Sequence, residues 1–154
     1  MIWKVNKTRK ILVVEDNSLV QRVLKHQFEA LKCTVETADN AAQAFQKMKN
    51  DHYHLIILDL GLPDKNGCDL AIDIQQWQAQ YHQYTPLVAL SAHVDPEQEQ
   101  RCYQAGITRV LTKPLSQRQA QDLLKSLTTT QANFHHQPKF DSDNRQERKP
   151  HEQY

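Results

Sequence analysis

Five side chains that could bind a metal ion and a phosphoryl group follow short apolar runs of this sequence. In chain order they are Glu15, Asp16, Asp59, Ser91 and Lys113. If each apolar run is a strand of one parallel sheet, the carboxyl ends of the strands meet at one edge, and ligands bind outside that edge. The spacing therefore predicts that three carboxylates, a hydroxyl and an ammonium group lie close together.

Each of these groups has a chemical use at a single site. Three neighbouring carboxylates repel one another unless a cation joins them. Mg²⁺ is the natural cation, because it takes oxygen ligands and commonly accompanies bound phosphate. One carboxylate can then attack a phosphoryl group and form an aspartyl phosphate. Mg²⁺, Lys113 and Ser91 can each hold one oxygen of the transferring group.

Taken singly, these residues have simpler explanations. Glu15 and Asp16 could interact with the dipole of a following helix, Ser91 could be a structural hydroxyl, and Lys113 could be a solvated surface lysine. The joint pattern favours the functional site. His93 lies two residues after Ser91, and both a surface position and a role in tuning the site remain open for it.

The elements that must position these groups can be read from the apolar pattern. Short apolar runs predict strands at residues 11–14, 33–37, 55–58, 87–90 and 107–111. The stretches between and after them have helical spacing. In the first helix, the apolar positions with this spacing include Val20, Val23, Leu24, Phe28 and Leu31. Five strands that alternate with five helices predict an α/β fold with a doubly wound parallel sheet.

Polar residues mark the expected helix ends. The predicted N-caps are Asn17 or Ser18, Asp39 or Asn40, Asp95, and Ser116. Gly106 can end the fourth helix. The third helix is expected from about residue 68 to 80, after a loop rich in turn-forming residues.

The composition restricts the class of protein. The formal net charge is +1, so we expect no nucleic acid as the main partner. No apolar run is long enough to span a membrane or to form a signal peptide, so we expect a cytoplasmic location and no membrane partner. The cysteines, Cys33, Cys68 and Cys102, form no metal-binding pattern, and we expect reduced, at least partly buried thiols.

Four segments of the sequence resemble the receiver domains of bacterial response regulators. They are ILVVEDN at 11–17, LIILDLGLPDKNG at 55–67, PLVALSA at 86–92 and RVLTKPL at 109–115. Their order and spacing make the resemblance specific, and the second segment is similar to receivers attached to hybrid histidine kinases. The resemblance implies the flavodoxin-like strand order 2-1-3-4-5, which makes the four functional strands contiguous.

The resemblance also implies roles for the acidic residues. Asp59 is the expected phosphoacceptor. Asp16 and Asp59 are expected to bind Mg²⁺ directly, and Glu15 through a water molecule. The backbone carbonyl of Gly61 is expected to be a further metal ligand.

On the phosphoryl side, the resemblance implies that Ser91 and Lys113 contact phosphoryl oxygens and that the peptide bond from Lys113 to Pro114 is cis. The sequence departs from the family at Val110, where many receivers have a tyrosine or phenylalanine that turns inward on phosphorylation. The way in which phosphorylation changes the surface is therefore not carried over from the family.

The expected organisation is an N-terminal extension (1–8), a receiver domain (9–127) and a polar, disordered tail (128–154). The expected function is a signalling module that takes a phosphoryl group from a histidine kinase or from a histidine phosphotransfer protein. We expect no DNA-binding output, so the module would act by protein–protein contact or as a phosphorelay intermediate. The sequence does not identify the downstream target.

Two other functions are consistent with parts of the pattern. An aspartyl-phosphate phosphohydrolase also uses a nucleophilic aspartate after a buried strand, but such enzymes resemble the pattern Asp-x-Asp, and here Gly61 holds the second position. We therefore expect no enzyme turnover beyond self-phosphorylation and slow autodephosphorylation. A degenerate scaffolding receiver is disfavoured because Asp16, Asp59, Ser91 and Lys113 are all present.

Overall fold

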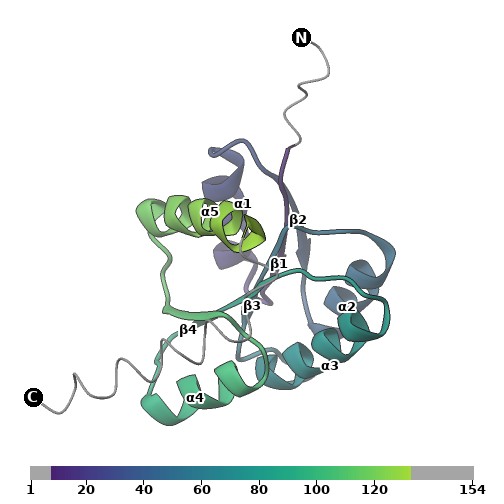
Figure 1. The fold of residues 1–154 in the computed structure, drawn as a ribbon. Coiled ribbons are helices and arrows are strands. Elements are labelled where there is room, and N and C mark those ends of the chain that lie inside the picture. Colours follow the sequence, from purple (N-terminus) through teal and green to yellow (C-terminus); the bar gives the residue numbers. More distant parts are fainter. Residues whose placement is uncertain (1–7, 133–154) are drawn as a thin grey trace, which may run out of the picture. The chain divides into compact units, whose positions relative to one another are not determined.

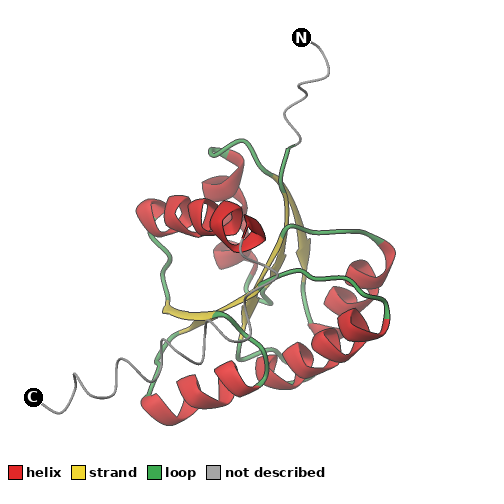
Figure 2. Cartoon of the chain, viewed as in Figure 1, coloured by secondary structure: helices red, strands yellow, loops and turns green. Residues whose placement is uncertain are grey.

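The computed structural model describes residues 8–132, in which strands and helices alternate (Figure 2). The strands are β1 (Lys10–Val14), β2 (Thr34–Ala38), β3 (Leu55–Asp59), β4 (Leu87–Ser91) and β5 (Arg109–Thr112). The helices are α1 (Ser18–Glu29), α2 (Ala41–Asn50), α3 (Gly67–Gln80), α4 (Pro96–Gln104) and α5 (Gln117–Ala132). The predicted alternation is confirmed.

The five strands form one parallel sheet in the order β2-β1-β3-β4-β5. β1 lies between β2 and β3, with Val14 opposite both Ala38 and Leu58. α1 covers one face of this sheet, and α2, α3 and α4 cover the other (Figure 1). The order confirms the predicted flavodoxin-like, doubly wound fold, and it makes the carboxyl ends of β1, β3, β4 and β5 neighbours.

The central strands are buried because helices cover both faces of the sheet. Every residue of β3 and of β4 is buried, as are four of the five residues of β1. This burial explains why these segments read as continuous apolar runs and do not alternate between apolar and polar residues. The polar groups at the strand ends therefore project from a rigid, close-packed support.

Side chains that accept from backbone N–H groups fix where the helices begin. The observed N-caps are Asn17, Asn40, Asn66 and Asp95 for α1 to α4. Before α5, the Ser116 hydroxyl accepts from the Gln119 N–H, and the Gln119 side chain accepts from the Ser116 N–H. This reciprocal pair is a capping box.

Two local details show the limits of the sequence pattern. Val23 shares the helical spacing of the apolar positions in α1 but is 48% exposed, because it lies on the flank of the buried stripe that Leu24 and Phe28 define. The fifth strand was expected from Ile107 but begins at Arg109. Gly106 has a φ of 93°, and the Ile107 N–H donates to the Cys102 carbonyl, so both residues belong to the end of α4.

The last helix is longer than expected. Residues 128–132 were assigned to the polar tail, but they continue α5. The chain divides into two units, one that ends at Ala120 and one that begins at Gln121, and this division falls within α5. The rest of the predicted tail (133–154) and most of the predicted N-terminal extension (1–7) lie outside the described residues. None of the helices in the described range has the length and apolar character needed to cross a bilayer.

Candidate phosphoacceptor site

The predicted site residues lie at the carboxyl ends of four adjacent strands. Glu15 directly follows β1, Asp59 ends β3, Ser91 ends β4, and Lys113 directly follows β5. Asp16 is the next residue after Glu15 and is exposed. The fold therefore brings together residues that lie as many as 98 positions apart in the chain.

The three carboxylates form one cluster. Glu15, Asp16 and Asp59 each offer an oxygen, and these oxygens lie within 4.8 Å of one another. Glu15 is 2% exposed and Asp59 is 8% exposed, whereas Asp16 is open to solvent. The cluster thus has two buried members and one exposed member on the solvent side.

Lys113 forms ion pairs with both buried carboxylates. Its Nζ lies 3.0 Å from Glu15 Oε1 and 3.2 Å from Asp59 Oδ1. The other oxygen of Glu15, Oε2, accepts from the Asn17 N–H at 3.1 Å. Asp59 Oδ1 also accepts from the Gly61 N–H at 3.1 Å. In the part of the chain that the structure describes, Lys113 thus pairs with two of the three clustered carboxylates, which leaves the cluster with excess negative charge.

This arrangement shifts the protonation equilibria of Glu15 and Lys113. Burial raises the pKa of Glu15, and the negative charge of Asp59 raises it further. The hydrogen bonds from the Asn17 N–H and Lys113 lower this pKa, but they do not outweigh burial. Burial alone would lower the pKa of Lys113, but the hydrogen bond to Glu15 and the charge of Asp59 outweigh it and raise the pKa. Lys113 is therefore a firmly protonated cation at this edge.

Ser91 is held by its own loop. Its hydroxyl donates to the His93 carbonyl at 2.9 Å and accepts from the His93 N–H at 3.3 Å. The His93 side chain is exposed, and its backbone makes these contacts with Ser91. The proposed contact of Ser91 with a phosphoryl oxygen stays a prediction, and making it requires Ser91 to exchange the His93 carbonyl for that oxygen.

The loop after Asp59 packs closely against the start of α3. The Gly67 N–H donates to the Leu60 carbonyl at 2.9 Å. A Cβ at Gly67 would lie 2.7 Å from the Asp59 carbonyl oxygen, so only glycine fits there without displacement. Gly61 has open space around it, with no heavy atom within 4 Å of a Cβ built at that position. The peptide bond from Lys113 to Pro114 is cis, as the resemblance implied.

Two residues that position the site were not identified from the sequence. Gln21 Nε2 donates to the Glu15 carbonyl at 2.8 Å and to Asp39 Oδ1 at 2.9 Å, and so ties the loops after β1 and β2 together. The carboxylate of Asp64 accepts from the Ala41 and Ala42 N–H groups, and so anchors the loop after β3 to the start of α2. Gln21 lies one helical turn after the cap of α1, which is a signal that could have identified it. No local pattern in the sequence indicates that Asp64 contacts the start of α2.

The donor set fits Mg²⁺. The cluster offers hard carboxylate oxygens from Glu15, Asp16 and Asp59, and its excess negative charge is relieved by a divalent cation. The exposed position of Asp16 leaves a solvent side where Mg²⁺ can keep some of its water, as it prefers to do. The predicted acidic residues are therefore brought together as expected.

Comparison with known proteins identifies similar chains. A family model described as the response regulator receiver domain matches residues 11–125. The chain is 32% identical to the sensory/regulatory protein RpfC of Xanthomonas campestris over 124 residues, which are 80% of this chain and 17% of that protein. It is 37% identical to the transcriptional regulatory protein KdpE of Staphylococcus aureus, covering 70% of this chain and 44% of that protein. The chain thus spans less than half the length of these curated relatives.

Solved structures give the same picture of the fold. A CheY-like receiver domain protein from Methanospirillum hungatei has a TM-score of 0.75 at 21% identity, covering 82% of this chain and 99% of that one. A co-crystal structure of the Saccharomyces cerevisiae histidine phosphotransfer signaling protein Ypd1 with the receiver domain of its downstream response regulator Ssk1 also matches. Its TM-score is 0.75 at 26% identity, covering 83% of this chain and 94% of that one.

Proposed function

Because this chain belongs to the response regulator receiver family, a family of two-component signalling, we propose that it accepts a phosphoryl group on Asp59 from a phosphohistidine of a partner protein. The observation that carries this proposal is the position of Asp59. Its carboxylate lies 3.2 Å from Lys113 Nζ and within 4.8 Å of the Glu15 and Asp16 carboxylates. The carboxylate that would act as nucleophile thus lies beside an ammonium group and two further carboxylates that could bind a metal ion.

The chemistry transfers one phosphoryl group between two proteins. An oxygen of Asp59 forms a bond to phosphorus as the bond from phosphorus to the histidine nitrogen breaks. That nitrogen keeps the bonding electrons and takes a proton from solvent, and the product is an aspartyl phosphate. Glu15, Asp16 and Asp59 would hold Mg²⁺, and the Gly61 carbonyl would complete the protein ligands. When bound, Mg²⁺ supplies charge neutralisation for the phosphoryl oxygens.

Lys113 and Ser91 have separate tasks in this transfer. The Lys113 ammonium already lies between Glu15 and Asp59, so it needs only a small movement to reach a phosphoryl oxygen. It then neutralises negative charge on the oxygens of the transferred phosphoryl group. Ser91 supplies a hydroxyl donor after it leaves the His93 carbonyl. Its movement would pull the loop before α4 and so carry the phosphorylation state to the surface.

We further propose that the chain is not a turnover enzyme. Gly61 occupies the second position after Asp59, where a phosphohydrolase of the Asp-x-Asp pattern has its acid–base group, and its N–H donates to Asp59 instead. The aspartyl phosphate would then be lost only by slow self-hydrolysis or by transfer. The module would act by protein–protein contact or as a relay intermediate.

The partner would be a histidine kinase or a histidine phosphotransfer protein. The yeast structure that matches this chain joins a receiver domain to a histidine phosphotransfer protein, and a matched relative from Pseudomonas protegens is the sensor histidine kinase GacS. The three free cysteines fit a reducing, cytoplasmic compartment. We propose neither nucleic acid nor a membrane as a partner.

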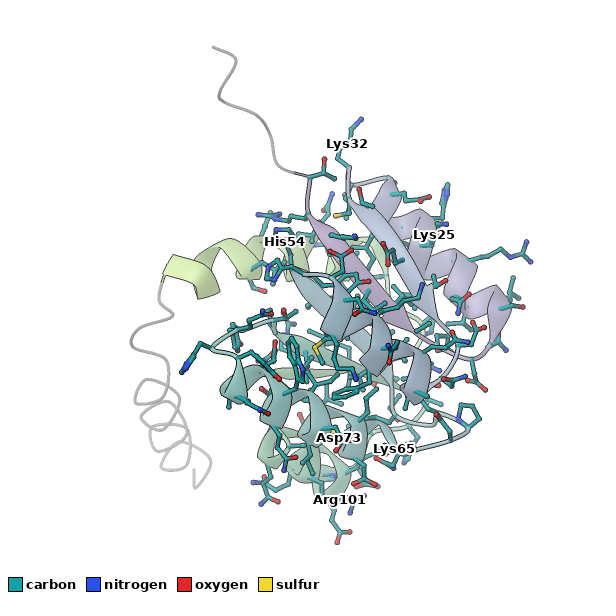
Figure 3. All side chains as sticks on the ribbon, turned by 90° about the vertical axis from the view of Figure 1, so that its right-hand side faces the viewer. Lys25, Lys32, His54, Lys65, Asp73 and Arg101 are labelled. Carbon is teal, nitrogen blue, oxygen red and sulfur yellow. The ribbon has the colours of Figure 1, made fainter. Side chains whose placement is uncertain are left out.

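Intact-mass spectrometry tests the assignment of Asp59. With Mg²⁺ and acetyl phosphate, or with a phosphorylated histidine phosphotransfer protein, the wild-type chain should gain one phosphoryl group. Asp59→Asn should gain none, because its neutral amide cannot replace the carboxylate as the nucleophile. Asp73→Asn is the matched control, since Asp73 lies on α3, is not a member of the acidic cluster, and pairs with Lys65 (both labelled in Figure 3). Equal labelling of wild type and Asp59→Asn would show that the phosphoacceptor lies elsewhere.

A further inference from the structure

Two of the three cysteines touch across two helices. Cys68 lies in the first turn of α3 and Cys102 lies in α4, and their Sγ atoms are 3.4 Å apart. Cys102 is completely buried, whereas Cys68 is partly exposed. The third cysteine, Cys33, is buried just before β2, where its Sγ lies 4.0 Å from the Leu31 carbonyl.

The elements that carry the two thiols are already held together. Cys102 belongs to the hydrophobic core, and Cys68 packs against that core from its edge. A second contact fixes the same pair of elements, because Gln75 Nε2 of α3 donates to the carbonyl of Gly106, just after α4, at 2.9 Å. The two sulfurs are therefore kept near each other by the surrounding packing.

We propose that Cys68 and Cys102 are a redox modification site, at which a peroxide joins the two thiols into a reversible disulfide that links α3 to α4. The sulfurs need to approach by roughly 1.4 Å to reach the length of a disulfide bond, about 2.0 Å. The proposal does not depend on the phosphorylation of Asp59.

The reaction proceeds in two balanced steps. The thiolate of Cys68 attacks one oxygen of hydrogen peroxide, the O–O bond breaks, and a sulfenic acid and water are formed once the leaving hydroxide has taken a proton. The Cys102 sulfur then attacks the Cys68 sulfur, the thiol proton leaves with the hydroxyl group as a second water, and the disulfide is formed. Two thiols are thus oxidised by two electrons, and one peroxide is reduced to two waters.

The order of these steps follows from accessibility. Cys68 is the thiol that solvent reaches. Burial, together with the contact from Cys68, raises the pKa of Cys102 to about 12, so Cys102 stays protonated while Cys68 reacts with the peroxide. Cys102 then acts as the resolving thiol, because the sulfenic acid of Cys68 forms directly against it.

The disulfide would restrain a part of the molecule that lies next to the phosphoacceptor. Cys68 directly follows Gly67, which packs on the carbonyl of Asp59. α4 begins after the loop of Ser91 and His93. A covalent link between Cys68 and Cys102 therefore ties α4 to the segment that packs on Asp59, and it opposes independent movement of α4.

Peptide mapping of the full chain after oxidation tests this site. The protein is treated with hydrogen peroxide, remaining thiols are blocked under denaturing conditions, and the peptides are analysed without reduction. We expect a linked pair of peptides that contain Cys68 and Cys102, lighter by two hydrogen atoms and released by dithiothreitol. The melting temperature of the oxidised chain should be higher by on the order of 5–10 °C, because the link closes a long loop in the unfolded chain.

Variants separate this bond from other oxidation. Cys33→Ala should keep the linked peptides, whereas Cys68→Ser and Cys102→Ala should each lose them together with the rise in melting temperature. If the buried Cys102→Ala variant does not fold, the partly exposed Cys68→Ser carries the same test. A sulfinic acid on Cys68 with Cys102 unmodified would overturn the proposal. So would a disulfide that involves Cys33, or one that joins two chains.

Discussion

Asp59 is surrounded by groups that fix its carboxylate before any phosphoryl group arrives. The Gly61 N–H and the Lys113 ammonium both contact its Oδ1, and Gly67 packs against its backbone carbonyl. Such preorganisation favours phosphoryl transfer, which depends mainly on positioning and on charge neutralisation. A single methyl group added at Gly67 would therefore displace the backbone around Asp59.

Gly67→Ala should therefore destabilise the fold. Its Cβ would lie 2.7 Å from the Asp59 carbonyl oxygen and 2.7 Å from the Leu60 Cα. Both neighbours are backbone atoms that cannot rotate away, so we expect a loss of about 1–3 kcal/mol in the free energy of unfolding. Urea denaturation measures this loss.

Gly61→Ala is the matched control for the same loop. A Cβ at Gly61 meets nothing within 4 Å, so its free energy of unfolding should be unchanged or slightly higher, because alanine restricts the unfolded chain. Equal stability of the two variants would contradict the close packing of α3 on the end of β3.

At the scale of elements, a polar network ties the beginnings of the strands together. Lys10 of β1 pairs with Glu36 of β2, at 3.0 Å, and with Asp51, which follows α2. Tyr53, before β3, is buried, and its hydroxyl donates to Glu36 Oε1 at 2.6 Å. These contacts link β1, β2 and the segment before β3, whereas the phosphoacceptor site lies after the strands.

This network should make stability depend on acidity through Glu36. The hydrogen bond from Tyr53 lowers the pKa of Glu36 below its ordinary value of 4.5, and the contact with Lys10 adds to this. The folded state then binds a proton less readily than the unfolded state, so the stabilisation is present above pH 4.5 and is lost as the pH falls below it. Glu36→Gln should be less stable than wild type at pH 7, and the difference should shrink in acid.

Melts at a series of pH values measure this difference. Tyr53→Phe is the companion variant, because it keeps the Glu36 carboxylate but removes the donor that lowers its pKa most. It should show the same shrinking difference from wild type in acid. A difference between Glu36→Gln and wild type that is the same at pH 7 and at pH 3 would show that Glu36 is not held in its charged form by the fold.

At the scale of the whole molecule, the strand order makes one site from distant residues. Because β1, β3, β4 and β5 are contiguous, the acidic pair after β1 lies beside Asp59, and Lys113 reaches across to both buried carboxylates. The same strand order places the three carboxylates of Glu15, Asp16 and Asp59 at one edge of the sheet, where their negative charges lie close together. The stability of the whole fold should therefore respond to a divalent cation.

Mg²⁺ should raise the melting temperature, because it relieves the repulsion among Glu15, Asp16 and Asp59. At about 100 times its dissociation constant, a ligand stabilises a fold by about 2.7 kcal/mol, which corresponds to a rise on the order of 10 °C for a domain of this size. Thermal melts with Mg²⁺ and with EDTA, at matched ionic strength, measure the effect.

Asp16→Asn should reduce this rise without loss of the fold, since Asp16 is exposed. Asp73→Asn should leave the rise unchanged, since Asp73 lies on α3 and pairs with Lys65. A wild-type midpoint that stays constant at tens of millimolar Mg²⁺ would argue against a metal site at this edge.

Much of this protein is determined locally by its sequence. Runs such as 55–58 predict buried strands, and caps such as Asn17 and Asp95 mark where helices begin, because both signals depend only on nearby residues. The resemblance of four short motifs predicted the strand order, which the structure confirms, and predicted that Glu15, Asp16, Asp59, Ser91 and Lys113 follow strands at one edge of the sheet. The start of β5 and the end of the last helix were predicted wrongly, and both are ends of elements, where local periodicity is least informative.

The tertiary structure alone decided which atoms meet. No local pattern shows that Lys113 pairs with Glu15 as well as with Asp59, or that the Ser91 hydroxyl is held by His93. The anchoring of the loop after β3 by Asp64 on α2, and the contact of Cys68 with Cys102, join residues that lie more than 20 positions apart. Such contacts depend on the order of the strands and on how the helices pack over them, and neither is encoded in the spacing of neighbouring residues.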